Sequence, residues 1–507
     1  MTKKTSNKNR TVTSTQLLMK TIDAFILYTR PEQAIKTVDQ LKKSECVRNI
    51  YLLTPQKEMQ PIDGCKIIEI DSMQSSETIQ KIGATSTADF ILIYQKSTVL
   101  QLGYFALERM TKIADETSAA MVYSDYYAVT NGKKKNHPVI DYQLGSLRDD
   151  FNFGSLLLFN SNIFKESAEK TRKHNYEFAG MYDLRLKAST DGKIVHINEY
   201  LYTEIDEDTR KSGEKIFDYV DPKNRKVQIE MEHACTQHLK DIKAFLEPKF
   251  EQVAFDKEEF EVEASVIIPV RNRIKTVRDA IESVLIQKTD FKFNIIVIDN
   301  HSTDGTTEAI EKIAQKDERL IHIIPNRDDL GIGGCWNTGV HHEKCGKFAI
   351  QLDSDDVYSD ENTLQKIVDA FYQQNSAMVV GTYQMTDFEM NPIPPGIIDH
   401  KEWTPDNGRN NALRINGLGA PRAFYTPILR NINIPNTSYG EDYAIGLSIS
   451  RNYQIGRIYD VLYLCRRWED NTDASLDIVK MNEHNTYKDK IRTWEILARQ
   501  AINKKKN

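Results

Sequence analysis

The stretch QLDSDDVYSD, residues 351–360, places four aspartates directly after a short apolar run. Like charges held this closely repel one another unless a cation lies among them. Two carboxylates spaced as Asp-x-Asp, here Asp353 and Asp355, suit Mg²⁺ or Mn²⁺, because these hard cations prefer oxygen ligands. A solvated loop that follows a strand is the competing interpretation. The stretch alone leaves both interpretations open, so the rest of the chain has to decide between them.

Two further groups of acidic residues lie where a strand ends or a helix begins. Asp299 ends the apolar run FNIIVID, and Glu441 and Asp442 follow the turn-forming stretch NTSYG. A carboxylate at a strand end can accept hydrogen bonds from a nucleobase N–H or a ribose hydroxyl, which suits Asp299. Asp442 can serve as a general base that takes a proton from an attacking hydroxyl. Such a base must stay away from the metal, since a bound cation would depress its pKa.

Alternating strands and helices are expected to position these acids. Apolar runs predict strands in both halves, at residues 23–28, 49–54, 89–94, 119–129, 264–270 and 293–299. Apolar residues at helical spacing predict helices between the strands. This alternation predicts an α/β fold with a mostly parallel sheet and helices on its faces. In such sheets ligands bind beyond the carboxyl ends of the strands, where the acidic groups fall.

The second half of the chain resembles a repeat of the first. NIYLLTP aligns with NIIVIDN, DFILIYQKSTVL with KFAIQLDSDDVY, and FAGMYDLRLKAS with SYGEDYAIGLSI. The alignment places residues 95–98 opposite 353–356 and residues 181–182 opposite 441–442. The first half therefore keeps the scaffold without the metal-binding and base carboxylates, although an error of one position would make Asp183 a candidate base. Two unrelated α/β domains with similar apolar patterns are the alternative.

The chain is too long for one ordinary core, which predicts more than one domain. The stretch VQIEMEHACTQHLKDIKAFL has apolar residues on one helical face, so we expect a connecting helix that packs against a domain. The expected segments are a disordered tail at 1–20, a degenerate domain at 21–215, a helical linker at 216–262, a catalytic domain at 263–478, and a C-terminal helix with a basic tail at 479–507.

Composition and charge argue against several classes of protein. A formal net charge of −6 gives the chain no general attraction to nucleic acid or to an anionic membrane. The six cysteines are scattered without a CxxC pair, which predicts reduced thiols in a cytosolic protein. The polar and basic N-terminus lacks the apolar core of a signal peptide. No run approaches the roughly 18 apolar residues that span a bilayer.

Four motifs in order, SVIIPVRNR, IVIDNHSTDGT, QLDSDD and YGED, resemble those of the family-2 glycosyltransferases with a GT-A fold. The resemblance covers about residues 263–470 and implies two tandem GT-A-like, Rossmann-like domains, of which the first is degenerate. It implies an inverting hexosyl transfer from a nucleotide-diphospho-sugar to a hydroxyl acceptor in surface polysaccharide or glycan assembly, with a UDP-sugar favoured and a GDP-sugar second. The roles it implies are nucleotide binding by Pro269, Val270, Asn272 and Asp299, metal and diphosphate binding by Asp353 and Asp355, an acceptor-side role for Glu441, and general base catalysis by Asp442.

The chain departs from the family pattern after its last strand. Relatives often carry a histidine there, available to metal or phosphate, whereas this chain has Trp468. Arg466, Arg467 or Asp470 would have to compensate, so the third metal contact stays open. The Gln-x-x-Arg-Trp signature of processive members is absent, because Cys465 stands near the glutamine position. This difference favours the transfer of one sugar per encounter.

The expected partners are a nucleotide-diphospho-sugar donor, a glycan or lipid-linked glycan acceptor, and Mg²⁺ or Mn²⁺, without nucleic acid. The stretch INGLGAPRAFYTP, residues 415–427, falls where relatives place acceptor-side residues, although a turn with a packed strand would explain it equally well. We expect a cytoplasmic protein. A peripheral contact with the inner face of the membrane and a homo-oligomer formed through the first half stay open.

Two other classes of function compete with the transferase. A non-catalytic scaffold that binds nucleotide-sugars or glycans would suit the first half, but the acids of the second half argue against it for the whole chain. A sugar nucleotidyltransferase would normally carry a glycine-rich basic loop directly after its first strand. This chain has PVRNR at that place, without glycine.

Overall fold

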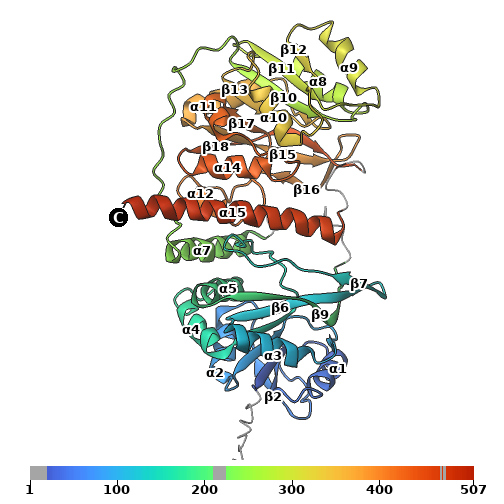
Figure 1. Cartoon of the computed structure of the whole chain (residues 1–507), viewed down its shortest axis with the longest axis vertical. Helices are drawn as coiled ribbons and strands as arrows, with labels where there is room; N and C mark the ends of the chain where they lie inside the picture. The colour runs from blue at the N-terminus through green and yellow to red at the C-terminus, as the bar shows by residue number, and fades with distance from the viewer. Residues whose placement is uncertain (1–19, 209–223, 469–470, 472–475, 507) are drawn as a thin grey trace, which may run out of the picture.

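The computed structural model describes residues 20–208, 224–468, 471 and 476–506, so the tail expected at 1–20 lies outside the described residues except for Lys20. Residues 22–205 and 264–466 each form one large sheet with flanking helices, and the two sheets lie at opposite ends of the molecule (Figure 1). Two helices cross between them, α7 (Arg225–Asp241) and the 29-residue α15 (Ile478–Lys506).

The first half alternates strands with helices. Its elements are β1 (Ile22–Leu27), α1 (Pro31–Leu41), β2 (Val47–Thr54), β3 (Cys65–Glu69), α2 (Ser76–Thr85), β4 (Phe90–Tyr94), β5 (Gln101–Leu102), α3 (Ala106–Thr117), β6 (Met121–Thr130), β7 (Lys133–His137), β8 (Leu156–Asn160), α4 (Ser161–Thr171), α5 (Gly180–Asp191) and β9 (Ile194–Ile205). All five residues of β4 are buried, as expected of a central strand with helices on both faces of its sheet.

The second half repeats this arrangement. Its elements are β10 (Ala264–Val270), α8 (Val277–Leu285), β11 (Phe293–Asp299), α9 (Thr306–Ala314), β12 (Leu320–Ile323), α10 (Ile332–Val340), β13 (Phe348–Gln351), β14 (Val357–Tyr358), α11 (Thr363–Gln374), β15 (Met378–Thr386), β16 (Pro392–Ile398), α12 (Gly408–Asn411), β17 (Arg422–Tyr425), α13 (Thr426–Ile432), α14 (Glu441–Ser450) and β18 (Ile455–Arg466). The run FNIIVID of β11 is buried along its whole length.

The two sheets have the same strand order. The path is β3-β2-β1-β4-β8-β6-β9-β5 in the first and β12-β11-β10-β13-β17-β15-β18-β14 in the second, and β7 and β16 pair with β6 and β15. Both sheets are mixed: β8 and β17 run antiparallel to both of their neighbours, whereas the strands from β3 to β4 and from β12 to β13 are parallel. A shared path of this length within one chain supports a duplication.

The structure moves the alignment of the two halves by one residue at the helix that precedes β9 or β18. α5 begins with Gly180 and α14 with Glu441, one position off the pairing expected from sequence. Tyr182 and Tyr443 then occupy the same place, and each donates its hydroxyl to a backbone carbonyl of an earlier segment. Met181 therefore stands where the base is expected, so the first half has no carboxylate at that position.

The connecting helix expected from sequence is α7, and it buries Cys235 and Leu239 of its apolar face. All six cysteines are free thiols. Of the helices in the described ranges, none is both long and apolar enough to cross a membrane.

Candidate active site

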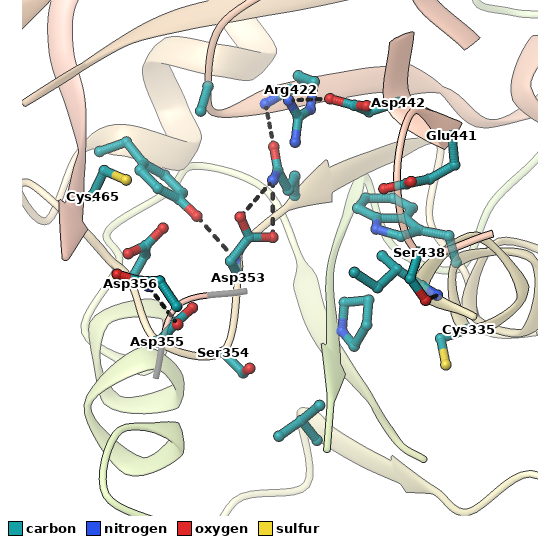
Figure 2. A pocket seen from close by; sticks show the side chains of 18 of the residues that line it. Cys335, Asp353, Ser354, Asp355, Asp356, Arg422, Ser438, Glu441, Asp442 and Cys465 are labelled. Atoms are coloured by element: carbon teal, nitrogen blue, oxygen red, sulfur yellow. Dashed lines mark hydrogen bonds and ion pairs between the residues drawn. The ribbon is translucent and has the colours of Figure 1, made fainter. Parts of the chain in front are cut away.

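A pocket of about 600 Å³ opens between the carboxyl ends of β10 and β13, the start of α14, and β18 (Figure 2). Parallel strands place their carboxyl ends at one edge of a sheet, which brings residues far apart in sequence into one cavity. Six of the eight residues predicted to form the site line this pocket: Pro269, Val270, Asp353, Asp355, Glu441 and Asp442.

Asp353 is held from two sides at the end of β13. Its carboxylate accepts hydrogen bonds from Gln351 Nε2 at 2.9 and 3.0 Å, and its backbone N–H donates to the Tyr463 hydroxyl at 3.0 Å. The other amide atom of Gln351 accepts a hydrogen bond from the backbone N–H of Arg422 at 3.2 Å, so a continuous chain of contacts links Asp353 to Arg422 (Figure 2). Burial, with a smaller contribution from Asp355, raises the pKa of Asp353 above its usual range.

Asp355 faces the same pocket and accepts hydrogen bonds from two neutral side chains. Its Oδ2 accepts hydrogen bonds from Trp468 Nε1 at 3.3 Å and from Asn471 Nδ2 at 3.2 Å, and it lies 3.7 Å from Arg273 Nε. Trp468 stands where relatives often carry a histidine. An indole N–H only donates, so Trp468 orients the carboxylate and offers no lone pair to a metal.

The residues expected to compensate for that histidine have different surroundings. Arg466 pairs with Asp279 at 3.0 Å, and its backbone N–H donates to Asp356 at 2.7 Å. Asp356 is buried, and burial raises the pKa of its carboxyl well above the usual range, which suits a structural role. Arg467 lines the pocket, and Asp470 lies outside the described residues.

Residues 353–356, which follow β13 and which we call the acidic loop, fit a divalent cation that is shared with a substrate. Asp353 and Asp355 line one cavity. Burial together with their mutual repulsion raises the pKa of Asp353, and a cation bound between them would lower that pKa again. Within the described ranges, no cluster of three His, Cys, Asp or Glu side chains could hold a metal. An ion here would therefore complete its shell with water and substrate phosphate oxygens, as Mg²⁺ commonly does.

Glu441 and Asp442, at the start of α14, have opposite protonation states. Arg422 Nη1 lies 2.7 Å from Asp442 Oδ2 (Figure 2). Burial raises the pKa of Asp442, but Arg422 and Lys488 outweigh it and hold that pKa below its usual value. Burial and the charge of Asp442 raise the pKa of Glu441 to about 8. At neutral pH Asp442 is ionised and Glu441 carries a proton.

Two of the predicted nucleotide-binding residues brace loops beside the pocket and do not line it. Asp299 is fully buried, and its Oδ1 accepts a hydrogen bond from the backbone N–H of Ser302 at 3.0 Å. Asn272 has a φ of 54° and accepts from the backbone N–H of Thr303 at 2.8 Å. These contacts shape the loops that follow β10 and β11. Asn300, next to Asp299, lines the pocket instead.

Sequence reasoning did not single out three residues that organise the site: Gln351, Arg422 and Tyr463. The only available signal was position, since Gln351 precedes the acidic loop and Arg422 lies within INGLGAPRAFYTP. Tyr463 reaches the acidic loop from β18, a strand more than 100 residues away along the chain. Such a contact becomes visible only in the folded sheet.

The corresponding place in the first half holds an internal ion pair. Lys96 follows β4 as the acidic loop follows β13, and its Nζ lies 2.6 Å from Glu204 Oε1. The hydroxyl of Ser155 donates to the other carboxylate oxygen of Glu204, which is buried. A lysine that is already neutralised in this way cannot take the place of a metal-binding aspartate. Asp183 is fully buried within α5, 3.6 Å from Lys187.

Residues 265–430 match the model of glycosyl transferase family 2. An uncharacterized glycosyltransferase of Rickettsia felis is 31% identical over 201 residues, 39% of this chain and 32% of that protein. A putative teichuronic acid biosynthesis glycosyltransferase of Bacillus subtilis, TuaG, is 26% identical over 149 residues, 29% of this chain and 58% of that protein. The solved structure of S. aureus TarS 1–349 in complex with UDP-GlcNAc has a TM-score of 0.36 at 22% identity and covers 47% of this chain and 72% of that chain.

The match to this chain spans only about a third of the length of the Rickettsia relative. The family match begins within β10, includes the acidic loop and ends within α13. The second half of the chain therefore carries a glycosyl transferase family 2 domain.

Proposed function

We propose that the second half catalyses an inverting, metal-dependent hexosyl transfer from a nucleotide-diphospho-sugar to a hydroxyl acceptor in surface polysaccharide or glycan assembly. A UDP-sugar is the favoured donor and a GDP-sugar the second. The observation that carries this proposal is the pocket shared by the acidic loop and the start of α14, with Asp353 and Asp355 on one wall and Glu441 and Asp442 on another.

The donor side of the proposal rests on the acidic loop. Mg²⁺ or Mn²⁺ held by Asp353 and Asp355 would stabilise the negative charge that develops on the departing diphosphate. Gln351 and Tyr463 keep the loop in place, and Arg273 lies beside Asp355 as a cation for phosphate oxygens. Pro269 and Val270 of β10 line the pocket for the nucleotide, while Asn272 and Asp299 shape its loops.

The acceptor side rests on two carboxyls whose environments push their pKa values apart, a pattern that separates acid from base roles. Asp442 is ionised and takes the acceptor proton, and Arg422 holds it in position until the acceptor hydroxyl arrives. Glu441 carries a proton at neutral pH and donates a hydrogen bond to the acceptor. The inverting outcome follows if the activated hydroxyl attacks the donor sugar opposite the diphosphate.

The remaining expectations belong to this proposal. The chain divides into the degenerate domain at 21–215, the linker at 216–262, the catalytic domain at 263–478 and the C-terminal helix at 479–507. The acceptor is a glycan or lipid-linked glycan at the cytoplasmic face of the membrane, and nucleic acid is no partner. The similarity to TuaG, a putative teichuronic acid biosynthesis glycosyltransferase, supports a role in polysaccharide assembly.

Calorimetry with UDP and GDP tests the proposal. Titrations with Mn²⁺ and with chelator would be run on the wild type and on the Asp353→Ala/Asp355→Ala variant. Asp360→Asn is the matched control, because Asp360 follows β14, just beyond the acidic loop, and accepts a hydrogen bond from the backbone N–H of Asn362 near the start of α11. We expect metal-dependent binding of one nucleotide in the wild type and the control, and none in the double variant. A folded wild type that binds neither nucleotide would contradict the transferase and favour the scaffold.

A further inference from the structure

α15 lies between the two halves and contacts both (Figure 1). On its first-half side it packs against residues 143–150, which we call the docking segment. A Cβ atom at Gly145 would lie 2.2 Å from Asp489 O and 2.3 Å from Thr493 N, so the segment touches the backbone of the helix. The Ser146 hydroxyl donates to Asp489 Oδ2 at 2.8 Å, and Arg148 Nε lies 3.5 Å from Asp489 Oδ1.

On its second-half side α15 contacts residues 414–421 and the start of α14, which we call the acceptor wall, chiefly through the buried Arg492. Arg492 has no exposed side-chain surface and pairs with Asp489 at 2.8 Å. The same guanidinium donates to the Tyr443 hydroxyl at 2.9 Å, to Ile415 O at 3.0 Å and to Asn416 Oδ1 at 2.9 Å. Tyr443 directly follows the proposed base, and Asn416 directly precedes the glycine-rich loop that lines the pocket.

The docking segment also contacts the acceptor wall directly. Asp149 Oδ2 lies 2.5 Å from Nη1 of the fully buried Arg414, and Asp150 accepts a hydrogen bond from Asn416 Nδ2 at 3.3 Å. Lys488 of α15 donates to Asn416 O at 2.6 Å. The loop that begins at residue 414 is therefore held by the docking segment and by α15 before it reaches the pocket.

Helix α5 of the first half holds the docking segment in turn. Tyr182 of α5 donates its hydroxyl to Leu147 O at 2.5 Å, and Arg185 donates to the carbonyls of Ser146 and Arg148. Backbone carbonyls that are bonded from a buried helix cannot move independently of that helix. The segment is thus tied to α5, a helix of the first half.

We propose that the first half positions the acceptor side of the active site, through the docking segment and the Asp489–Arg492 pair of α15. In this view the first half has lost its own site and keeps the loop at 414–421 and the start of α14 in the geometry that transfer requires. Arg492 is a positioning residue, because it reaches the proposed base only through Tyr443. The kinetic consequence rests on the proposed function, but the structural coupling does not.

Hydrogen–deuterium exchange tests the coupling without any substrate. Gly145→Ala forces the docking segment away from α15, and Ser146→Ala is a milder variant that removes one hydrogen bond. We expect exchange at residues 412–422 and 439–446 to rise about fivefold, as for the loss of about one hydrogen bond, while β10, β11 and β13 stay protected. Gly83→Ala is the matched control, because its Cβ would meet only ordinary contacts at 3.5 Å. Unchanged exchange in those two stretches, or a uniform rise across the chain, would overturn the proposal.

A kinetic split tests the role in transfer. Release of UDP from UDP-glucose, UDP-galactose or UDP-GlcNAc would be measured for the wild type, Arg492→Lys and Arg492→Met. We expect an unchanged KM for the donor and a kcat reduced about 10- to 100-fold in Arg492→Met, with partial recovery in Arg492→Lys. A rise in the donor KM by the same factor as the fall in kcat would overturn the positioning role. If the wild type binds no nucleotide, the proposed function fails, and the exchange experiment still decides the coupling.

Discussion

The two halves share one strand order and differ at the carboxyl ends of their central strands. In the first half Lys96 and Glu204 form an ion pair after β4, whereas in the second Asp353 and Asp355 face a pocket after β13. The sheets and most helices tolerate this difference, because their stability comes from buried apolar strands that are alike in both. A few residues at the strand ends therefore decide whether the site is an open pocket or is filled by an internal ion pair.

The starts of the helices α5 and α14 differ between the two halves in the same way. In the first half Glu230 of α7 accepts hydrogen bonds from the backbone N–H groups of Phe178 and Ala179, which precede α5, and Gly180 packs against the start of α2. In the second half the start of α14 faces the pocket and carries Glu441 and Asp442. An internal carboxylate thus occupies a helix start that could otherwise attract an anion.

The largest effect should come from removing the proposed base. Asp442→Asn keeps the shape of the side chain but cannot take a proton, so we expect kcat for transfer to fall about 10²- to 10⁴-fold while donor binding persists. Asp183→Asn, in the first half, is the matched control and should leave kcat unchanged. A wild-type rate in Asp442→Asn would remove Asp442 from the mechanism and weaken the contrast between the halves.

The next effect concerns the ion pair that fills the first half. Glu204→Ala leaves Lys96 without its buried partner and should lower the free energy of unfolding by about 3 kcal/mol, the low end for such pairs because Lys96 keeps about a third of its side chain exposed. The double variant Lys96→Met/Glu204→Gln should lose less of the free energy of unfolding. Urea unfolding measures both. A stability equal to that of the wild type in Glu204→Ala would show that the pair is dispensable for the first half.

A pH-dependent effect should appear in the stability of the second half. The folded state raises the pKa of Glu441 from 4.5 to about 8, so the folded protein binds the extra proton in this window. The free energy of unfolding contributed by Glu441 should therefore fall as the pH rises from about 4.5 to about 8. Glu441→Gln should remove that slope in urea unfolding between pH 4.5 and 8. An unchanged slope would mean that Glu441 titrates normally.

The smallest effect should come from a charge cluster in the first half. His196 lies 2.9 Å from Asp125 and 2.7 Å from Asp141, and these carboxylates outweigh burial and raise its pKa above 6.5. The stability it contributes should be complete below pH 6.5 and lost as the pH rises through the raised pKa. His196→Gln should flatten this part of the curve. A slope that persists in the variant would assign it to another group.

Much of the fold could be read from the sequence because its signals are local. FNIIVID is a run of apolar and β-branched residues that is buried as a strand in any α/β sheet, and β11 has those bounds. The repeat of such runs anticipated two similar halves. The antiparallel direction of β8 and β17 was not anticipated, because strand direction depends on which strands meet after the chain has crossed the sheet.

The candidate site likewise combines residues that the sequence predicts with contacts that it does not. Asp-x-Asp after a strand and Glu-Asp before a helix can be recognised from residue type and spacing, and the pocket brings both together. The pairing of Arg422 with Asp442 and the contact of Tyr463 with the acidic loop could not be recognised in this way, because each contact joins residues from distant strands, helices or loops. Asp299 illustrates the opposite case, since its strand-end position predicted a ligand contact while its carboxylate binds Ser302 within the protein.

The sequence by itself determined the strands, the helices, the duplication and the carboxylates available for chemistry, because these depend on the character of neighbouring residues. Only the tertiary structure decided which carboxylates share a cavity, which are ionised and what holds the acceptor wall. Those properties depend on burial and on charges brought together from distant segments. Asp489 and Arg492 belong to no recognisable motif in the sequence. They connect the two halves only because folding brings distant segments against α15.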